Sequence, residues 1–229
     1  MSTLLEQAEL AADLLGAAAH ENGRIVCTAE SLTGGMVSEL ITSVAGSSAW
    51  FDRGYVTYQI SGKEEMIDVP AEVIAEFGVV SEPVAEAMAR GALACSHADL
   101  SVALTGVAGP SGGTAQTPVG TVCIGWAERD PSGAIATSVR TIHATGDRRT
   151  VRLAASLTAL QGLIALIRGG RFWELMNRFE NEEEAIKNGF FKGFTREEVI
   201  FMGEMDVVEF GNKYYQLCYY YMTELDLDY

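Results

Sequence analysis

The fold is best inferred from one segment, Thr28-Ala29-Glu30-Ser31-Leu32-Thr33-Gly34-Gly35. A short apolar strand is predicted from Arg24 to Thr28 at its start, and a helix from Met36 to Ser43 after it. A strand that passes through a glycine turn into a helix is the repeating unit of α/β folds. Ser31 is therefore expected at the carboxyl end of a strand and beside a helix N-terminus, where free backbone amides favour negative charge.

This setting suits a serine nucleophile in acyl transfer, because preorganised donors must meet the oxyanion of the tetrahedral intermediate. The alternative is that Ser31 or Thr33 only caps the helix, while Gly34 and Gly35 pack close to the sheet. The local pattern leaves both interpretations open.

A serine nucleophile also needs a base. The histidines lie at a helix end, in a polar turn and in a strand, so a Ser-His-Asp triad is poorly supported; they are His20, His97 and His143. Lys63 is the better candidate, because it follows a predicted strand from Gly54 to Tyr58. A lysine acts as a base only if burial or a nearby cation lowers its pKa towards neutrality. The alternative is a solvated lysine at the start of a helix.

Two further segments are suited to binding an anion. A glycine-rich loop from Thr105 to Gly113 follows another predicted strand, and its glycines let backbone amides approach a ligand closely. It matches neither the Walker pattern nor a dinucleotide fingerprint, so it is a weak signal alone. Gly146-Asp147-Arg148-Arg149 precedes the last long helix, where one arginine is placed to hold a phosphate through two hydrogen bonds. An ordinary charged helix start is the alternative.

Helices and strands alternate along residues 1–168. Further helices are predicted at Leu4–Asn22, Ala71–Phe77, Pro83–Leu93 and Val151–Ile167, and further strands at Leu100–Thr105, Gly120–Glu128 and Ala134–His143. Strands separated by helices indicate an α/β three-layer sandwich, in which a mostly parallel sheet is covered on both faces. The last two strands, joined by a turn at Asp130-Pro131-Ser132-Gly133, are predicted to form one antiparallel hairpin.

Composition changes near Gly169-Gly170. Beyond this point lie 14 of the 20 aromatic residues, none of the five prolines, and 13 acids against 6 bases. We therefore predict a body over residues 1–168 and a small aromatic, acidic C-terminal extension over residues 169–229. The extension is predicted to contain two helices and a hairpin: Arg171–Lys187, a helix begun by a Thr195/Glu198 capping box, and strands on either side of Gly211-Asn212.

Charge and composition exclude several classes of protein. The formal charge of −15 argues against direct binding to nucleic acid. The N-terminus has no basic n-region and no apolar run approaches ~18 residues, so we expect a cytoplasmic protein that does not span a membrane. The four cysteines are far apart and lack CxxC pairing, which favours free thiols over a metal site.

Seven segments occur together and in a characteristic order. They are Ala29–Gly35, Gly46–Phe51, Tyr55–Tyr58 with Lys63, Val80–Val84, Thr105–Pro110, Pro118–Val122 and Gly146–Arg148. In this combination, over about residues 5–167, the chain resembles the CinA C-terminal domain family, whose members are nicotinamide-mononucleotide deamidases.

The resemblance implies a Ser/Lys amidohydrolase of pyridine nucleotide salvage, a homo-oligomer that needs no metal or organic cofactor. Ser31 would attack the carboxamide of nicotinamide mononucleotide, and Lys63 would take its proton, so that ammonia leaves and nicotinic acid mononucleotide follows. The other residues carried over are Tyr58 and Thr105 in support of the dyad, the amides of Thr33, Gly34 and Gly35 as oxyanion donors, and Gly106, Gly109, Gly112 and Arg148 against the substrate.

One segment departs from the family pattern. Gln59-Ile60-Ser61-Gly62 lacks the asparagine that usually follows the family's tyrosine, which bears on substrate positioning and leaves the dyad intact. This segment and the aromatic extension favour the rival interpretation, a catalytically silent interaction protein whose C-terminal extension binds a protein partner.

Overall fold

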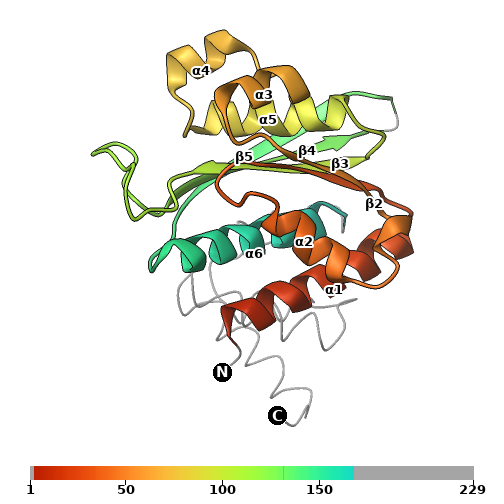
Figure 1. Cartoon of the computed structure of the whole chain (residues 1–229). Coiled ribbons are helices and arrows are strands. Elements are labelled where there is room, and N and C mark those ends of the chain that lie inside the picture. Colours follow the sequence, from red (N-terminus) through yellow and green to blue (C-terminus); the bar gives the residue numbers. More distant parts are fainter. Residues whose placement is uncertain (1–2, 131, 168–229) are drawn as a thin grey trace, which may run out of the picture. The chain divides into compact units, whose positions relative to one another are not determined.

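A sheet in the order β2-β1-β3-β4-β5 organises the domain (Figure 1). The computed structural model describes residues 3–130 and 132–167. The strands are β1 (Val26–Glu30), β2 (Phe51–Val56), β3 (Leu100–Gly106), β4 (Thr121–Arg129) and β5 (Ile135–His143). The helices are α1 (Leu4–Asn22), α2 (Met36–Ser43), α3 (Ile60–Ile67), α4 (Ala71–Phe77), α5 (Glu82–Ala94) and α6 (Arg148–Ile167), with a 3-10 turn, η1, at Ser47–Ala49. The α/β class predicted from the sequence is confirmed.

Helices cover both faces of the sheet. On one face lie α3, α4 and α5, and on the other lie α1, α2 and α6 (Figure 1). On the first face α5 packs across β1, β3, β4 and β5, and it buries Val84, Met88 and Leu93 completely. On the second face α6 packs against α1 and against β3 and β4. Ser31 follows β1, which lies inside the sheet between β2 and β3.

The sheet is mixed, which corrects the expectation of a mostly parallel one. Strand β1 is parallel to both neighbours, β2 and β3. The predicted antiparallel hairpin is confirmed as β4 and β5, but β3 and β4 are also antiparallel. The reason is the connection between β3 and β4, which is a loop over residues 107–120 and contains no crossover helix. The loop returns the chain at the same end of the sheet.

Local sequence signals explain where the helices begin and end. At α1, Thr3 and Glu6 form a capping box, and Gly23 ends the helix in the left-handed region with φ 60°. Ser81 caps α5, because its Oγ accepts a hydrogen bond from the amide of Val84 at 3.4 Å. The helices predicted at Met36–Ser43 and Ala71–Phe77 have the predicted bounds.

The apolar helix α6 is a core element of the domain. It is the one helix in the described part of the chain that is long and apolar enough to cross a membrane, and 78% of its apolar window is buried inside the domain. Gly162 lets it approach the sheet, since a Cβ there would lie 2.2 Å from the indole of Trp126. The Trp126 Nε1 donates to the carbonyl of Ala159 at 3.0 Å, which ties β4 to this helix.

Strand β2 is displaced from its predicted position. It runs from Phe51 to Val56, although the sequence predicted Gly54–Tyr58. Its start is set by the preceding residue, Trp50, whose carbonyl accepts a hydrogen bond from the amide of Val26 at 2.8 Å. Gly54 is needed inside the strand, because a Cβ would lie 2.3 Å from Ser38 Oγ of α2.

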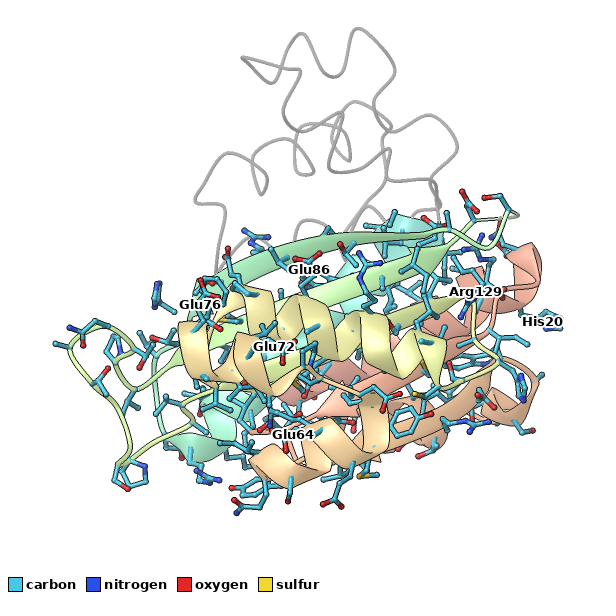
Figure 2. All side chains as sticks on the ribbon, turned by 90° about the horizontal axis from the view of Figure 1, so that it is seen from above. His20, Glu64, Glu72, Glu76, Glu86 and Arg129 are labelled. Atoms are coloured by element: carbon cyan, nitrogen blue, oxygen red, sulfur yellow. The ribbon has the colours of Figure 1, made fainter. Side chains whose placement is uncertain are left out.

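Acidic side chains lie on the helix layer formed by α3, α4 and α5. Figure 2 shows Glu64, Glu72, Glu76 and Glu86 on these three helices. The compact unit that contains the sheet ends at Ile167. The elements predicted for residues 169–229 lie outside the described residues, as does Cys218, and the division of the chain at residue 168 stays a prediction.

Candidate active site

Ser31 is the first residue after β1 and is half-buried. Its amide donates to the carbonyl of Leu104 on β3 at 3.0 Å, which anchors the turn to the middle of the sheet. Gly34 and Gly35 then adopt left-handed conformations, with φ 58° and 98°, and lead into α2. Only glycine enters this region at little cost, so the Gly-Gly pair is what allows so tight a turn after Ser31.

Lys63 lies in the fourth position of α3 and reaches back to Ser31. Its Nζ donates to Ser31 Oγ at 3.2 Å and to the carbonyl of Thr57 at 2.7 Å. The lysine is 0% exposed, so the solvated-lysine interpretation is wrong. None of the ion pairs formed by the described residues includes Lys63. Burial lowers the pKa of the amine to about 8, because the protein interior disfavours its charged form.

Backbone amides near Ser31 divide into two sets. Gly34 donates to the carbonyl of Ser31 at 3.1 Å, and Gly35 donates to Glu30 Oε2 at 2.9 Å. These two amides are therefore occupied within the protein, which corrects their assignment as oxyanion donors. No hydrogen bond joins the amide of Leu32 or of Thr33 to another described residue, and these two follow Ser31 directly.

Tyr58 and Arg148 meet outside the dyad. Arg148 Nη2 donates to the Tyr58 hydroxyl at 3.2 Å, and Nη1 donates to the carbonyl of Gly109 at 2.8 Å. Tyr58 is 55% exposed. Arg148 thus joins the segment between β2 and α3 to the loop between β3 and β4, and the Tyr58 hydroxyl is bonded to Arg148 and not to Lys63.

Thr105 is buried beside the site and acts on a different neighbour. Its hydroxyl donates to the carbonyl of Val79 at 2.6 Å, which holds the end of β3 to the segment before α5. Among the described residues no hydrogen bond joins Thr105 to Ser31 or Lys63. Thr105 therefore fixes the end of β3, where the carbonyl of Leu104 accepts the hydrogen bond from the Ser31 amide.

The three glycines predicted against the substrate occupy the end of β3 and the loop after it, which projects beyond the sheet (Figure 1). A Cβ on Gly106 would lie 2.6 Å from the carbonyl of Thr121, so this glycine permits close packing against β4. Gly109 and Gly112 have φ 77° and 93°. The structure joins Gly109 to Arg148.

A cavity of about 550 Å³ lies at the N-terminal end of α6. It is lined by Met36, Asp147, Arg148, Arg149 and Arg152. Arg152 also donates through Nη2 to the carbonyl of Thr33 at 2.5 Å, so the cavity adjoins the turn that carries Ser31. Three arginine side chains line this cavity together with Asp147, and their positive charge would suit a phosphate group.

Residues 8–167 match the CinA C-terminal domain family. The chain belongs to this family. The nicotinamide-nucleotide amidohydrolase PncC of Escherichia coli K12 is 47% identical over 149 residues, which are 65% of this chain and 88% of that protein. A CinA-like protein of Mycobacterium sp. strain JLS is 47% identical over 148 residues, which are 65% of this chain and 34% of that protein.

Solved structures of CinA proteins share the fold. The competence/damage inducible protein CihA of Agrobacterium tumefaciens aligns with a TM-score of 0.66 at 41% identity, covering 72% of this chain and 99% of that one. The competence damage-inducible protein A of Klebsiella pneumoniae aligns with a TM-score of 0.66 at 34% identity, covering 71% of this chain and 98% of that one. Every candidate residue of the site lies within the CinA match.

Two residues of the candidate site were missed in the sequence: Glu30 is a buried carboxyl group next to Ser31, and Thr57 supplies the carbonyl that holds Lys63. Arg152 lines the cavity and holds Thr33. The one sequence signal was the position of Glu30 between an apolar strand and a glycine turn, where a buried acid requires several donors.

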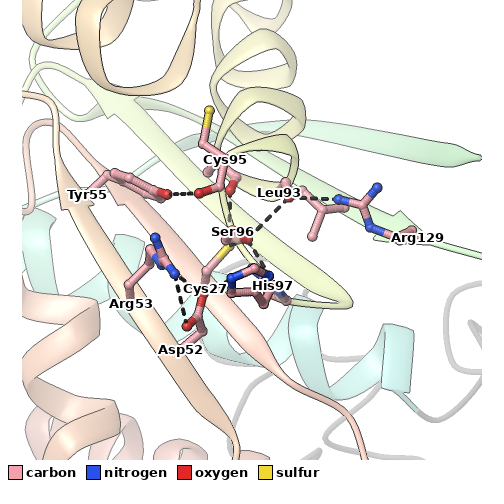
Figure 3. A network of polar contacts seen from close by, with 11 residues as sticks. Cys27, Asp52, Arg53, Tyr55, Leu93, Cys95, Ser96, His97 and Arg129 are labelled. Atoms are coloured by element: carbon pink, nitrogen blue, oxygen red, sulfur yellow. Dashed lines mark hydrogen bonds and ion pairs between the residues drawn. The ribbon is translucent and has the colours of Figure 1, made fainter. Parts of the chain in front are cut away.

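Among the described residues no hydrogen bond joins a histidine to Ser31 or Lys63, in agreement with the weak case for a Ser-His-Asp triad. His97 belongs to a polar network at the opposite end of β1, with Asp52, Arg53, Tyr55 and Ser96 (Figure 3). There the amide of His97 donates to Asp52 Oδ2 at 3.2 Å. His20 is in the last turn of α1, and His143 ends β5. The cysteines of the described residues, Cys27, Cys95 and Cys123, are free thiols.

Proposed function

We propose that the chain hydrolyses the carboxamide of nicotinamide mononucleotide to nicotinic acid mononucleotide and ammonia. One observation carries the proposal: a fully buried lysine amine, without a charged partner among the described residues, lies 3.2 Å from Ser31 Oγ. Relatives at 46–47% identity are named nicotinamide-nucleotide amidohydrolase, which supports this substrate. Such a reaction belongs to pyridine nucleotide salvage.

Neutral Lys63 begins the reaction by taking the proton of Ser31 as Oγ bonds to the carboxamide carbon. The negative charge that develops on the carboxamide oxygen would be met by the amides of Leu32 and Thr33. Protonated Lys63 then gives its proton to the amide nitrogen, the carbon–nitrogen bond breaks, and ammonia leaves an ester on Ser31. Lys63 next takes a proton from water, which attacks the ester, and the released Ser31 oxygen recovers that proton.

The arginine cavity would hold the phosphate of the mononucleotide. Arg148, Arg149 and Arg152 surround it, and Arg152 also contacts Thr33, so the anion site and the nucleophile are joined by one side chain. The backbone at Gly106, Gly109 and Gly112 would approach the phosphate end of the substrate closely. Tyr58 and Thr105 would act by holding Arg148 and the end of β3.

Ammonia release from nicotinamide mononucleotide tests the proposal directly. We expect turnover by the full chain at neutral to mildly alkaline pH, and none by the Ser31→Ala variant prepared in the same way. Turnover equal in both proteins would remove Ser31 as the nucleophile. No release from either would favour the silent interaction protein, for which the C-terminal extension is the predicted partner-binding segment.

A further inference from the structure

Glu30 is a fully buried carboxyl group directly before Ser31, and its side chain turns towards α2. Oε2 accepts hydrogen bonds from the amides of Gly35 at 2.9 Å and Val37 at 3.1 Å. Oε1 accepts from the amide of Ser38 at 2.9 Å and from its hydroxyl at 2.7 Å. Four donors from the start of α2 thus converge on one carboxyl group, which accepts from all of them as an ionised carboxylate does.

The position of this cap in the chain is unusual. A helix is normally capped by the side chain of the residue just before its first turn, which at α2 is Gly35 and has no side chain. Here the cap comes from the last residue of β1, on the far side of Ser31. The carboxylate therefore joins the two ends of the turn over residues 31–35 and fixes their positions.

The backbone of Glu30 reaches the other half of the dyad. Its carbonyl accepts a hydrogen bond from the amide of Thr57 at 2.9 Å. The carbonyl of Thr57 in turn accepts from Lys63 Nζ at 2.7 Å. One residue is thus bonded through its side chain to the turn of the nucleophile, and through its main chain to the residue that holds the base.

Glu30 also decides which amides remain for an oxyanion. It binds the amides of Gly35, Val37 and Ser38 and so directs them away from any substrate at Ser31. The amides of Leu32 and Thr33 have no hydrogen bond to another described residue. We propose that Glu30 is a positioning residue that sets Ser31 and these two amides in register for acyl transfer. The inference rests on the proposed function, and Glu30 itself touches no reacting atom.

Replacing the carboxylate by a carboxamide tests this role with little change of volume. In Glu30→Gln one oxygen becomes an NH₂ group, which faces N–H donors and cannot accept from them. We expect kcat to fall about 100-fold, the effect of misplacing a catalytic group by about 1 Å. KM should change less than about threefold, because the arginine cavity is not altered. Glu6→Gln, the same change at the N-terminus of α1, should leave both constants unchanged.

A milder pair of variants covers the case in which Glu30→Gln fails to fold. Ser38→Ala removes one 2.7 Å hydrogen bond to Glu30, and Ser101→Ala removes one 2.7 Å hydrogen bond to the carbonyl of Ala89 on the other side of the sheet. Both variants lose a 2.7 Å hydrogen bond of a hydroxyl group, and Ser38→Ala also loses a 2.8 Å hydrogen bond between the hydroxyls of Ser38 and Thr28. We expect Ser38→Ala to lower kcat about fivefold, as the loss of ~1 kcal/mol of positioning implies, and Ser101→Ala to keep it. Equal kcat in the two variants would overturn the inference.

Labelling of Ser31 separates this inference from the deamidase proposal. Diisopropyl fluorophosphate reacts with activated serines, and intact-mass spectrometry follows the adduct, with Ser31→Ala as the blank. We expect labelling of the wild-type chain and labelling at least about 30-fold slower in Glu30→Gln at the same folded fraction. If wild-type Ser31 is labelled but no ammonia is released, the proposed substrate is wrong, and the labelling rates of wild type and Glu30→Gln still test the role of Glu30. Equal labelling rates in folded Glu30→Gln and wild type, or no labelling of wild-type Ser31, would overturn the role of Glu30.

Discussion

Lys63 acts as a base only after it has lost a proton. Burial lowers its pKa to about 8, so the neutral form grows as pH rises through that value. We expect kcat/KM for nicotinamide mononucleotide to increase with an apparent pKa of about 8 and to level off above it. Initial rates of ammonia release between about pH 6 and about pH 10 measure this profile. A profile that is flat throughout would contradict a lysine base.

Ser31 supplies the oxygen atom of the proposed acyl ester, and an alanine side chain cannot supply it. We expect Ser31→Ala to lower kcat by at least about 1,000-fold while the far-ultraviolet circular dichroism and the unfolding midpoint stay close to wild type. The small volume change at a half-buried position explains the intact fold. Activity retained within about threefold would remove Ser31 as nucleophile.

The buried amine of Lys63 also lowers the free energy of unfolding near neutral pH, as its lowered pKa implies. The folded-state pKa of about 8 lies below the unfolded value of about 10.4, so the unfolded chain binds more protons between these values. The free energy of unfolding of wild type should therefore rise as pH increases from about 8 to about 10.4. Lys63→Met should lack this rise, lose turnover, and be more stable than wild type at neutral pH by about 1–3 kcal/mol. Denaturant unfolding at two pH values checks this, and Lys63→Arg should not restore turnover because guanidinium stays protonated.

Ser31, the proposed nucleophile, is easier to recognise in the sequence than the residues around it. Ser31 stands out because a predicted strand precedes it and two glycines and a predicted helix follow it, and this pattern involves only neighbouring residues. The burial of Lys63 is a tertiary effect, because the two contacts that define it, to Ser31 and Thr57, depend on how α3 packs against the end of β1. The occupation of the Gly34 and Gly35 amides likewise depends on the direction in which Glu30 turns, which no spacing reveals.

At the scale of elements, the first turns of α6 bring three arginines to one cavity. Arg148 is expected to contribute to binding more than to chemistry. Arg148→Ala should raise KM for the mononucleotide about 10-fold or more, as the loss of a charge-assisted hydrogen bond to phosphate implies. It should leave nicotinamide riboside, which has no phosphate, little affected. Steady-state kinetics on both substrates measures the split, and equal losses would make Arg148 structural, through its bonds to Tyr58 and Gly109.

Arg149→Ala is the matched comparison for this experiment. Arg149 lines the same cavity on the same turn of α6. A larger rise in KM for Arg149→Ala than for Arg148→Ala would transfer the phosphate contact to Arg149. Arg152→Ala is expected to lower kcat as well, since Arg152 holds the carbonyl of Thr33 in the turn of the nucleophile.

Elements with strong local signals were predicted well, and those set by neighbours were not. Helix α4, which ends before Gly78, has its predicted bounds, and the capped helix α5 differs from its prediction by one residue at each end. Strand β2 moved because its start follows Trp50 and because Gly54 serves contact with Ser38 and does not mark a boundary. The antiparallel β3–β4 pairing was missed, since strand order and direction depend on contacts between residues far apart in the chain.

Within the described domain, an acidic layer and the arginine cavity lie on opposite faces of the sheet. The chain carries a formal charge of −15, and the layer of α3, α4 and α5 displays Glu64, Glu72, Glu76 and Glu86 (Figure 2). The arginine cavity lies at the N-terminal end of α6, a helix of the opposite layer. The acidic layer of α3, α4 and α5 would repel a phosphate group and the arginine cavity would attract it, so we infer that the association rate falls as salt screens the arginines.

The C-terminal extension is predicted to be dispensable for the chemistry. The family match ends at residue 167, and every residue assigned to the site lies before Gly169. The extension carries 13 acids against 6 bases, which is a poor environment for a phosphate group. We therefore expect a chain truncated after Arg168 to keep kcat and KM within about threefold, while the loss of 14 aromatic residues changes solubility or oligomeric state. Ammonia release, light scattering and circular dichroism measure these properties together. A truncated chain that is folded and monodisperse yet inactive would show that residues 169–229 complete the site and that the predicted division of the chain is wrong.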